Sequence, residues 1–139
     1  MKLVYIAGRF RAHTPWGIEQ NIRKAEETGL AVAKLGGVPV IPHSQYRFFQ
    51  ESMPEAFWLE ATCEQLRRCD AIMLVPGWEQ SEGSRLEKNE AERRNIPVFE
   101  SLMALGSWLY EAERRNIPVF ESLTALGSWL YYLYVATTK

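Results

Sequence analysis

The sequence predicts a single α/β domain, a three-layer sandwich in which helices cover both faces of a parallel sheet of about five strands. Two observations carry this prediction. Short runs rich in β-branched residues alternate with longer segments of helical periodicity, and the connections between them are short. The chain of 139 residues is also long enough to bury its own core, so we expect one domain over residues 1–139.

The first strand is expected at residues 3–8, where the run LVYIAG is apolar and ends in glycine. A loop containing Pro, Gly and Thr follows at 9–17, and the spacing of apolar residues over 18–35 predicts a helix. Two glycines at 36–37 end this helix. The run VPVIP then predicts a second strand at 38–42.

The middle of the chain contains the strongest strand signal. Residues 43–54 are polar and aromatic without a clear period, and we expect them to run over the sheet edge as a loop. Pro54 can occupy the first turn of a helix over 55–68, which the spacing of apolar residues predicts. The run AIMLV at 71–75 is apolar throughout and predicts a central strand that is buried on both faces.

A further helix, strand and helix follow, and they are expected at 84–94, 96–99 and 100–115. The carboxyl ends of parallel strands meet at one edge of a sheet, where α/β proteins bind their ligands. This rule brings three loops together at one site, and they are residues 8–17, 43–50 and 78–84.

Residues 90–110 and 111–131 are copies of one sequence and differ only at Met103 and Thr124. Such near identity indicates a recent or engineered duplication, because old repeats diverge. We therefore look for the function first in the part of the chain outside the duplication.

Each copy holds the end of a helix, a strand and the start of the next helix. We expect the second copy to add a further parallel strand at 117–120, the sixth if the sheet already has five, and a final helix over 122–135. The tail of that helix is apolar nearly all round, which suits burial against a partner subunit in a homo-oligomer. The alternative is that one copy is looped out or exchanged with a neighbouring chain.

The composition excludes several classes of function. With 16 Lys and Arg against 17 Asp and Glu the net charge is −1, so nothing favours binding to nucleic acid or an anionic membrane. Cys63 and Cys69 lack the companions that a disulfide framework or a metal site would need. No glycine-rich phosphate motif, signal peptide or membrane-spanning run occurs, so we expect a cytoplasmic protein without a cofactor.

Glu87 is the sharpest catalytic candidate. It lies one turn into the helix after the central strand, where a side chain points back toward the carboxyl ends of the strands. A carboxylate there can attack an electrophilic sugar carbon or stabilise an oxocarbenium-like centre. Gly83 lets a ligand approach the backbone, and free N–H groups near Ser84 can hold an anion or sugar oxygens. On spacing alone, a glutamate favoured by the helix dipole explains the residue at least as well.

Three segments resemble a known superfamily, and they are DAIMLVPGWEQSEGSRLE at 70–87, YIAGRF at 5–10 and VIPHS at 40–44. They are similar to the nucleoside 2-deoxyribosyltransferase-like superfamily, and more narrowly to its small bacterial and phage branch, the DUF4406 family, with the pattern CDAI-x-L-x-PGW-x-x-S-x-G-x-x-x-E. The resemblance covers roughly residues 1–100. It implies a flavodoxin-like fold, oligomers, and cleavage or exchange of the N-glycosidic bond of 2′-deoxynucleosides or nucleotides.

The resemblance also implies roles for single residues. Glu87 corresponds to the nucleophile, and Gly83 to the glycine before it. Ser81 corresponds to the serine that contacts the phosphate in the nucleotide hydrolases. Gly8 ends the first strand, beside a loop that lines the sugar pocket.

One position departs from the superfamily pattern. The transferases carry a second carboxylate eight residues before the Asp of CDAI, and the chain has Thr62 there. A threonine cannot act as a carboxylate acid or base. Glu60 and Glu64 are two residues away, which is roughly 160–200° round a helix. A protein that binds a nucleotide without turnover is therefore a credible alternative.

Four other side chains near the strand ends are candidates with two readings each. Arg9 or Arg11 can pair with a phosphate or remain solvated. His43 can hydrogen-bond a base or sugar, or can bond to the backbone, and Trp78 can stack on a base or pack over its own loop. His13 is expected at the surface.

These observations support three hypotheses. The first is an enzyme that acts on a nucleoside or nucleoside 5′-monophosphate through Glu87, with the sugar and any phosphate held by Gly8, Arg9, Ser81, Gly83 and Ser84. The second is a binding or sensing protein of the same fold. The third is an oligomerising protein whose pocket is vestigial.

Overall fold

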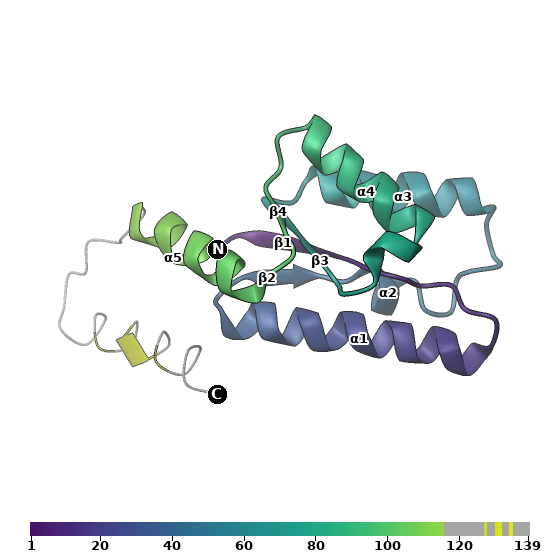
Figure 1. Cartoon of the computed structure of the whole chain (residues 1–139), viewed down its shortest axis with the longest axis horizontal. Coiled ribbons are helices and arrows are strands. Elements are labelled where there is room, and N and C mark those ends of the chain that lie inside the picture. Colours follow the sequence, from purple (N-terminus) through teal and green to yellow (C-terminus); the bar gives the residue numbers. More distant parts are fainter. Residues whose placement is uncertain (116–126, 128–129, 132–133, 135–139) are drawn as a thin grey trace.

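Four parallel strands form the centre of the molecule in the order β2-β1-β3-β4 (Figure 1). The computed structural model describes residues 1–115, 127, 130, 131 and 134. The strands are β1 (Leu3–Ala7), β2 (Val38–Val40), β3 (Ala71–Leu74) and β4 (Val98–Phe99). The described residues thus hold one strand fewer than the five that we expected. The strand expected at 117–120 lies outside them, and the helix expected over 122–135 is described at four positions only, all helical.

The strand at 71–75 was predicted to be central, and the structure confirms this position. β3 pairs with β1 on one side, where Tyr5 lies beside Ile72, and with β4 on the other, where Ile72 lies beside Val98. All residues of β3 are buried, as expected for a strand covered on both faces.

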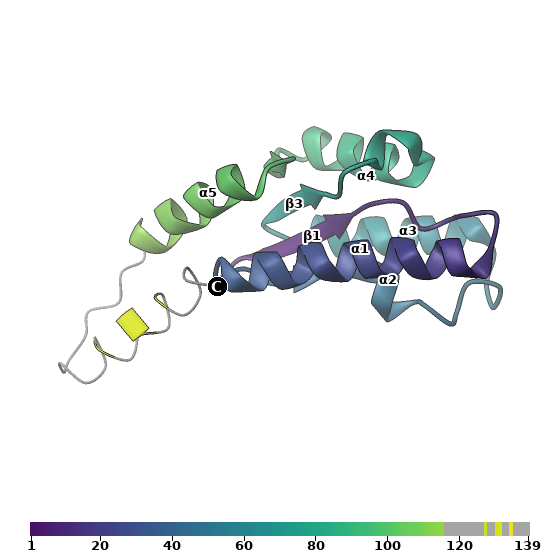
Figure 2. The ribbon, with the colours of Figure 1, turned by 60° about the horizontal axis from the view of Figure 1, so that its bottom comes forward.

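Helices cover both faces of the sheet. Five of them are described, together with one 3₁₀ turn: α1 (Pro15–Lys34), α2 (Pro42–Gln45), α3 (Glu55–Arg67), η1 (Trp78–Gln80), α4 (Glu82–Arg93) and α5 (Leu102–Arg115). Figure 1 shows the sheet between α1 and the α3–α4 pair. Figure 2 shows α1 running along the strands, and α4 and α5 above them in this view. Within the described part of the chain, no helix is both long and apolar enough to cross a membrane.

The alternation of side chains along each strand divides the core into two halves. Val4, Ile6 and Met73 pack with residues of α1 and α5 on one face. Tyr5 and Ile72 pack with residues of α3 and α4 on the other. This period of two is what a strand buried on both faces requires, and it places Tyr5 on the same side as the helix that carries Glu87.

Two helices begin earlier than the apolar spacing alone predicted. α1 begins at Pro15 rather than 18, because the Thr14 side chain accepts a hydrogen bond of 3.0 Å from the Gly17 N–H and caps the helix. α4 begins at Glu82 rather than 84, because Ser81 caps it in the same way. In both cases the capping residue lies in a segment for which the spacing of apolar residues predicted a loop.

Candidate functional site

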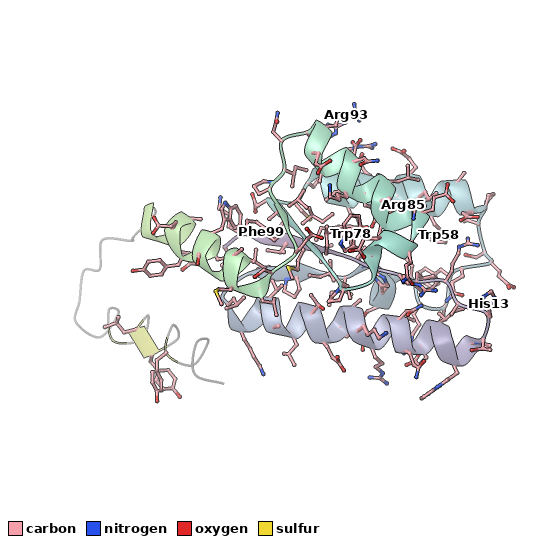
Figure 3. All side chains as sticks on the ribbon, in the orientation of Figure 1. His13, Trp58, Trp78, Arg85, Arg93 and Phe99 are labelled. Carbon is pink, nitrogen blue, oxygen red and sulfur yellow. The ribbon has the colours of Figure 1, made fainter. Side chains whose placement is uncertain are left out.

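An open cleft of about 890 Å³ lies at the carboxyl edge of the sheet. Its walls come from the β1–α1 loop, α2, the first half of α3 and the start of α4, and Figure 3 shows His13 and Trp58 at this end of the molecule. The size suits a nucleotide-sized ligand. Seven of the eight expected site residues line it: Gly8, Arg9, His43, Ser81, Gly83, Ser84 and Glu87.

Glu87 lies on the inner wall of this cleft and is only 8% exposed. The Tyr5 hydroxyl donates a hydrogen bond of 2.6 Å to Glu87 Oε1, across the gap between β1 and α4. Burial raises the pKa of the Glu87 carboxyl to about 7, against the smaller lowering effect of hydrogen bonds from Tyr5 and Thr62. The carboxyl group therefore changes its charge near neutral pH, which is unusual for a structural glutamate.

Tyr5 keeps its proton, because burial and the adjacent carboxylate raise the pKa of its phenol well above the ordinary value. It therefore acts as a donor toward Glu87 throughout the neutral range. Oε1 accepts this bond, and the carboxyl group lines the cleft.

Thr62 lies where the superfamily pattern has a carboxylate, and it faces the same pair of residues. It lines the cleft, and its hydroxyl contributes to the pKa of both Tyr5 and Glu87. The hydroxyl has one proton, which it can donate either to the Glu87 carboxylate or to the Leu59 carbonyl oxygen 3.1 Å away. Glu60 and Glu64 instead form ion pairs with Arg67, and neither lines the cleft.

The start of α4 forms a second polar wall. The Ser81 Oγ accepts a hydrogen bond of 3.2 Å from the Ser84 N–H, which leaves the Ser81 hydroxyl proton available to a ligand. The N–H groups of Glu82 and Gly83 belong to the first turn, where a helix has no internal partners for them. A Cβ at Gly83 would meet only Leu59 at 3.7 Å and Ser81 at 3.9 Å, so the protein itself has room for one.

Gly8 has a different reason to be glycine. A Cβ at this position would come within 2.8 Å of the Val75 Cβ, so the end of β1 could not lie against the end of β3 with any larger residue. Gly8 therefore fixes the floor of the cleft through packing, whatever the ligand.

Two exposed arginines hold the β1–α1 loop across the cleft. Arg9 Nη1 donates a hydrogen bond of 3.0 Å to Gln80 Oε1, and Arg11 forms an ion pair of 2.9 Å with Glu55. Arg9 is exposed and lines the cleft. His13, expected at the surface, is exposed at the rim of the same cleft.

His43 is buried, and its Nε2 faces the carbonyl oxygens of Gly8 at 3.0 Å and Arg9 at 3.2 Å. Two acceptors around Nε2 mean that this nitrogen carries the hydrogen. Burial lowers the pKa of the imidazole, which is therefore neutral at pH 7. The backbone reading of His43 thus holds for Nε2, and the residue supports the β1–α1 loop while lining the cleft.

Trp78, which the sequence left either to stack on a base or to pack over its own loop, does not line this cleft. Its Nε1 donates a hydrogen bond of 2.8 Å to Glu100, and Lys88 lies 5.7 Å from the centre of its ring. The αL residue Gly77 turns the chain there, and η1 carries Trp78 onto the far side of α4. The Trp78 ring thus packs against α4 and against the core on that face of the sheet.

Sequence reasoning missed an aromatic wall made by Tyr46 and Trp58, whose ring centres lie 4.9 Å apart. Both come from the segment that showed no period. Tyr5 was also missed as a site residue, although a tyrosine within a buried aliphatic strand is a signal that could have found it. Among the described residues, no group of three or more His, Cys, Asp or Glu side chains could hold a metal ion.

Comparison with protein-family models gives a match. A family model described as "Domain of unknown function (DUF7768)" matches residues 2–101. None of the curated proteins matches the chain. The matched segment contains all four strands and every residue that lines the cleft, and it ends just before α5. The chain therefore belongs to the DUF7768 family.

Proposed function

We propose that the chain binds a nucleoside or a nucleoside 5′-monophosphate in this cleft and cleaves or exchanges its N-glycosidic bond through Glu87. The observation that carries the proposal is a buried carboxylate on the wall of a ligand-sized cleft, held at one oxygen by a tyrosine that cannot lose its proton. A purely structural glutamate would be expected to have a cationic partner or to face solvent.

The fold and the sequence motif support the same proposal. The order β2-β1-β3-β4 reproduces the first four strands of the flavodoxin-like order, which agrees with the fold that the superfamily resemblance implies. The segment that carries the resemblance, residues 70–87, runs from β3 to Glu87 and supplies one wall of the cleft.

The reaction would proceed in two displacements at the anomeric carbon. The Glu87 carboxylate attacks that carbon and forms a glycosyl ester, while the base leaves with the electron pair of the broken C–N bond. Water, or a second base in the exchange reaction, then attacks the same carbon and breaks the ester C–O bond, which releases the carboxylate. The departing base takes up one proton from solvent, and the attacking water or base gives one proton back. The hydrogen bond from Tyr5 orients the nucleophile and becomes stronger as the ester breaks and negative charge returns to Glu87.

The two ends of a nucleotide suit two parts of the cleft. A phosphate would lie against the N–H groups of Glu82 and Gly83 and the Ser81 hydroxyl, within reach of Arg9. A base would lie against the aromatic wall of Tyr46 and Trp58.

One observation favours a second candidate function, a nucleotide-binding protein without turnover. The leaving base usually needs a proton, and Thr62 offers a hydroxyl where the superfamily has an acid. Of the other carboxylates that line the cleft, Glu55 is paired with Arg11 and Glu82 is exposed.

Incubation with a panel of deoxynucleosides, ribonucleosides and their 5′-monophosphates, followed by chromatography of the free base, tests the proposal. Release of base by the wild type, and its loss in Glu87→Ala with ligand binding retained, would support it. Binding without release would favour the second candidate, and Thr62→Asp should then create or increase activity. No binding at all would mean that the cleft is vestigial.

A further inference from the structure

The first copy of the duplicated sequence fills one well-defined slot, formed by β3 and the end of α1. Within it, β4 pairs with β3, where Val98 lies beside Ile72. Leu105 and Leu109 of α5 are 0% and 2% exposed in the core beneath the sheet. Gly106 packs so closely against Leu35 that an added Cβ would lie 3.2 Å from its side chain. Residues 95–110 therefore form a docked strand–helix module.

The second copy contains the same module at residues 116–131. The only difference falls on Met103, which is 83% exposed in the docked copy, so every residue that contacts the slot is present twice. The described positions of the second copy are not docked in this way. Leu130, the counterpart of Leu109, is 51% exposed, and a Cβ at Gly127 would meet nothing within 4 Å.

The position of α5 restricts where the second copy can go within its own chain. The crossover from β1 to β2 uses α1 on one face, and the crossover from β3 to β4 steps the opposite way using α4 on the other face, so both have the same hand. α5 packs on the α1 face. A parallel strand outside β4 reached through α5 would need a crossover of the opposite hand, which parallel sheets almost never contain.

We propose that the slot now filled by residues 95–110 is also the docking site of residues 116–131, so that the chain exchanges between two registers 21 residues apart. In the first register residues 95–110 fill the slot, as the structure shows. In the second register α4 is unchanged, residues 95–115 form a long loop, and the second copy supplies the strand beside β3 and the helix beneath the sheet.

Two effects keep the registers close in free energy. The second register requires a longer loop, but the entropy of loop closure rises only slowly with length. The second effect favours the second register, because the apolar stripe that contains Leu109 or its counterpart Leu130 continues with different residues after each copy. Three residues after Leu109 the first register has Ala112, whereas three residues after Leu130 the second has Leu133. The larger residue offsets part of the cost of the loop.

Matched aspartate substitutions at the two equivalent leucines test the exchange by thermal unfolding of the full chain. Leu130→Asp should leave Tm almost unchanged. Leu109→Asp should lower it by only a few degrees, because the second copy takes over the slot. The double variant has no intact copy and should lose more than about 10 °C, or should not fold. If Leu109→Asp alone is as damaging as the double variant, or if the double variant is as stable as the wild type, the proposal is wrong.

Hydrogen exchange read by mass spectrometry provides an independent measurement, because the Met103 and Thr124 peptides differ in mass. In the wild type, slow exchange is expected over residues 95–110. In Leu109→Asp, the slow exchange should move to residues 116–131. Loss of slow exchange from the first copy without a gain in the second would overturn the proposal, even if the variant remains folded.

Discussion

Glu87 and Glu90 lie three residues apart on α4, and their surroundings drive their carboxyl groups in opposite directions. Glu87 faces the cleft with one neutral donor, and burial raises its pKa to about 7. Glu90 accepts hydrogen bonds from Arg67, Arg93 and Arg94, with Arg67 the largest cause, and these lower its pKa to about 2. Figure 3 shows Arg85 and Arg93 near the start and the end of this helix.

The charged carboxylate of Glu90 stabilises the fold, whereas the charged carboxylate of Glu87 destabilises it. Glu90 keeps its charge because cations compensate for its desolvation, and its side chain is 11% exposed. Glu87 is buried to a similar extent, but among the described residues its hydrogen-bond partners are hydroxyl groups. Helix α4 does not need a buried carboxyl group without a cationic partner at position 87 in order to fold. Two neighbouring carboxyl groups with such different pKa values are typical of a functional site.

The largest expected effect is on the proposed reaction. Glu87→Gln should reduce the rate of base release by about 10³-fold or more, because the amide cannot act as the nucleophile. Glu90→Gln is the matched control on the same helix and should change the rate by less than about twofold. Free base measured by chromatography gives both rates. Equal losses in the two variants would show that the fold of α4 matters and the chemistry of Glu87 does not.

The next effect concerns stability and pH. A carboxyl group whose pKa is higher in the folded than in the unfolded state binds its proton more tightly when folded, so it favours folding at low pH. This contribution is lost as the pH rises from about 4.5 to about 7. Replacing Glu87 with Gln should therefore stabilise the protein at pH 8 relative to pH 4 by up to about 3 kcal/mol, compared with the wild type. Urea unfolding at both pH values measures the difference, and parallel curves for the two proteins would contradict it.

Removing the hydroxyl of Tyr5 should widen the difference in pKa between Glu87 and Glu90. Tyr5→Phe deletes the hydrogen bond to the charged form of Glu87, so the pKa of Glu87 should rise above 7. The rate at pH 7 should fall by about 10- to 100-fold, and the acid limb of the pH–rate profile should move to higher pH. Tyr46→Phe removes a hydroxyl from another wall of the cleft and should not move that limb. An unchanged limb in Tyr5→Phe would mean that Tyr5 has no influence on the nucleophile.

The parts of this site that the sequence predicted are those fixed by local pattern. The alternation of strand and helix placed Gly8, His43 and Glu87 at one edge of the sheet, and the structure places all three on the cleft. Tyr46 and Trp58 were missed because their approach depends on how an aperiodic segment packs.

The environment of a residue is harder to predict than its position. The contrast between Glu87 and Glu90 depends on the packing of α3 and β1 against α4, which brings Arg67 to one glutamate and Tyr5 to the other. No spacing within α4 contains that information. The direction of Trp78 was left open for a similar reason, since the left-handed Gly77 turns the chain just before it.

The smallest effect is expected from a substitution of Glu90. The folded state holds Glu90 at a pKa below that of the unfolded chain, so its contribution to stability is complete above about pH 4.5 and disappears as the pH falls toward 2. Glu90→Gln should lower Tm at pH 7 by a few degrees, because Arg93 and Arg94 are largely solvated and only Arg67 is well shielded. The gap from the wild type should narrow when Tm is measured at pH 3. Glu64→Gln breaks pairs with Arg67 and Arg68, but its own side chain is half exposed, so it should have a smaller effect at pH 7. A Tm gap for Glu90→Gln that stays constant from pH 7 to pH 3 would assign the loss to packing and would remove the electrostatic half of the comparison.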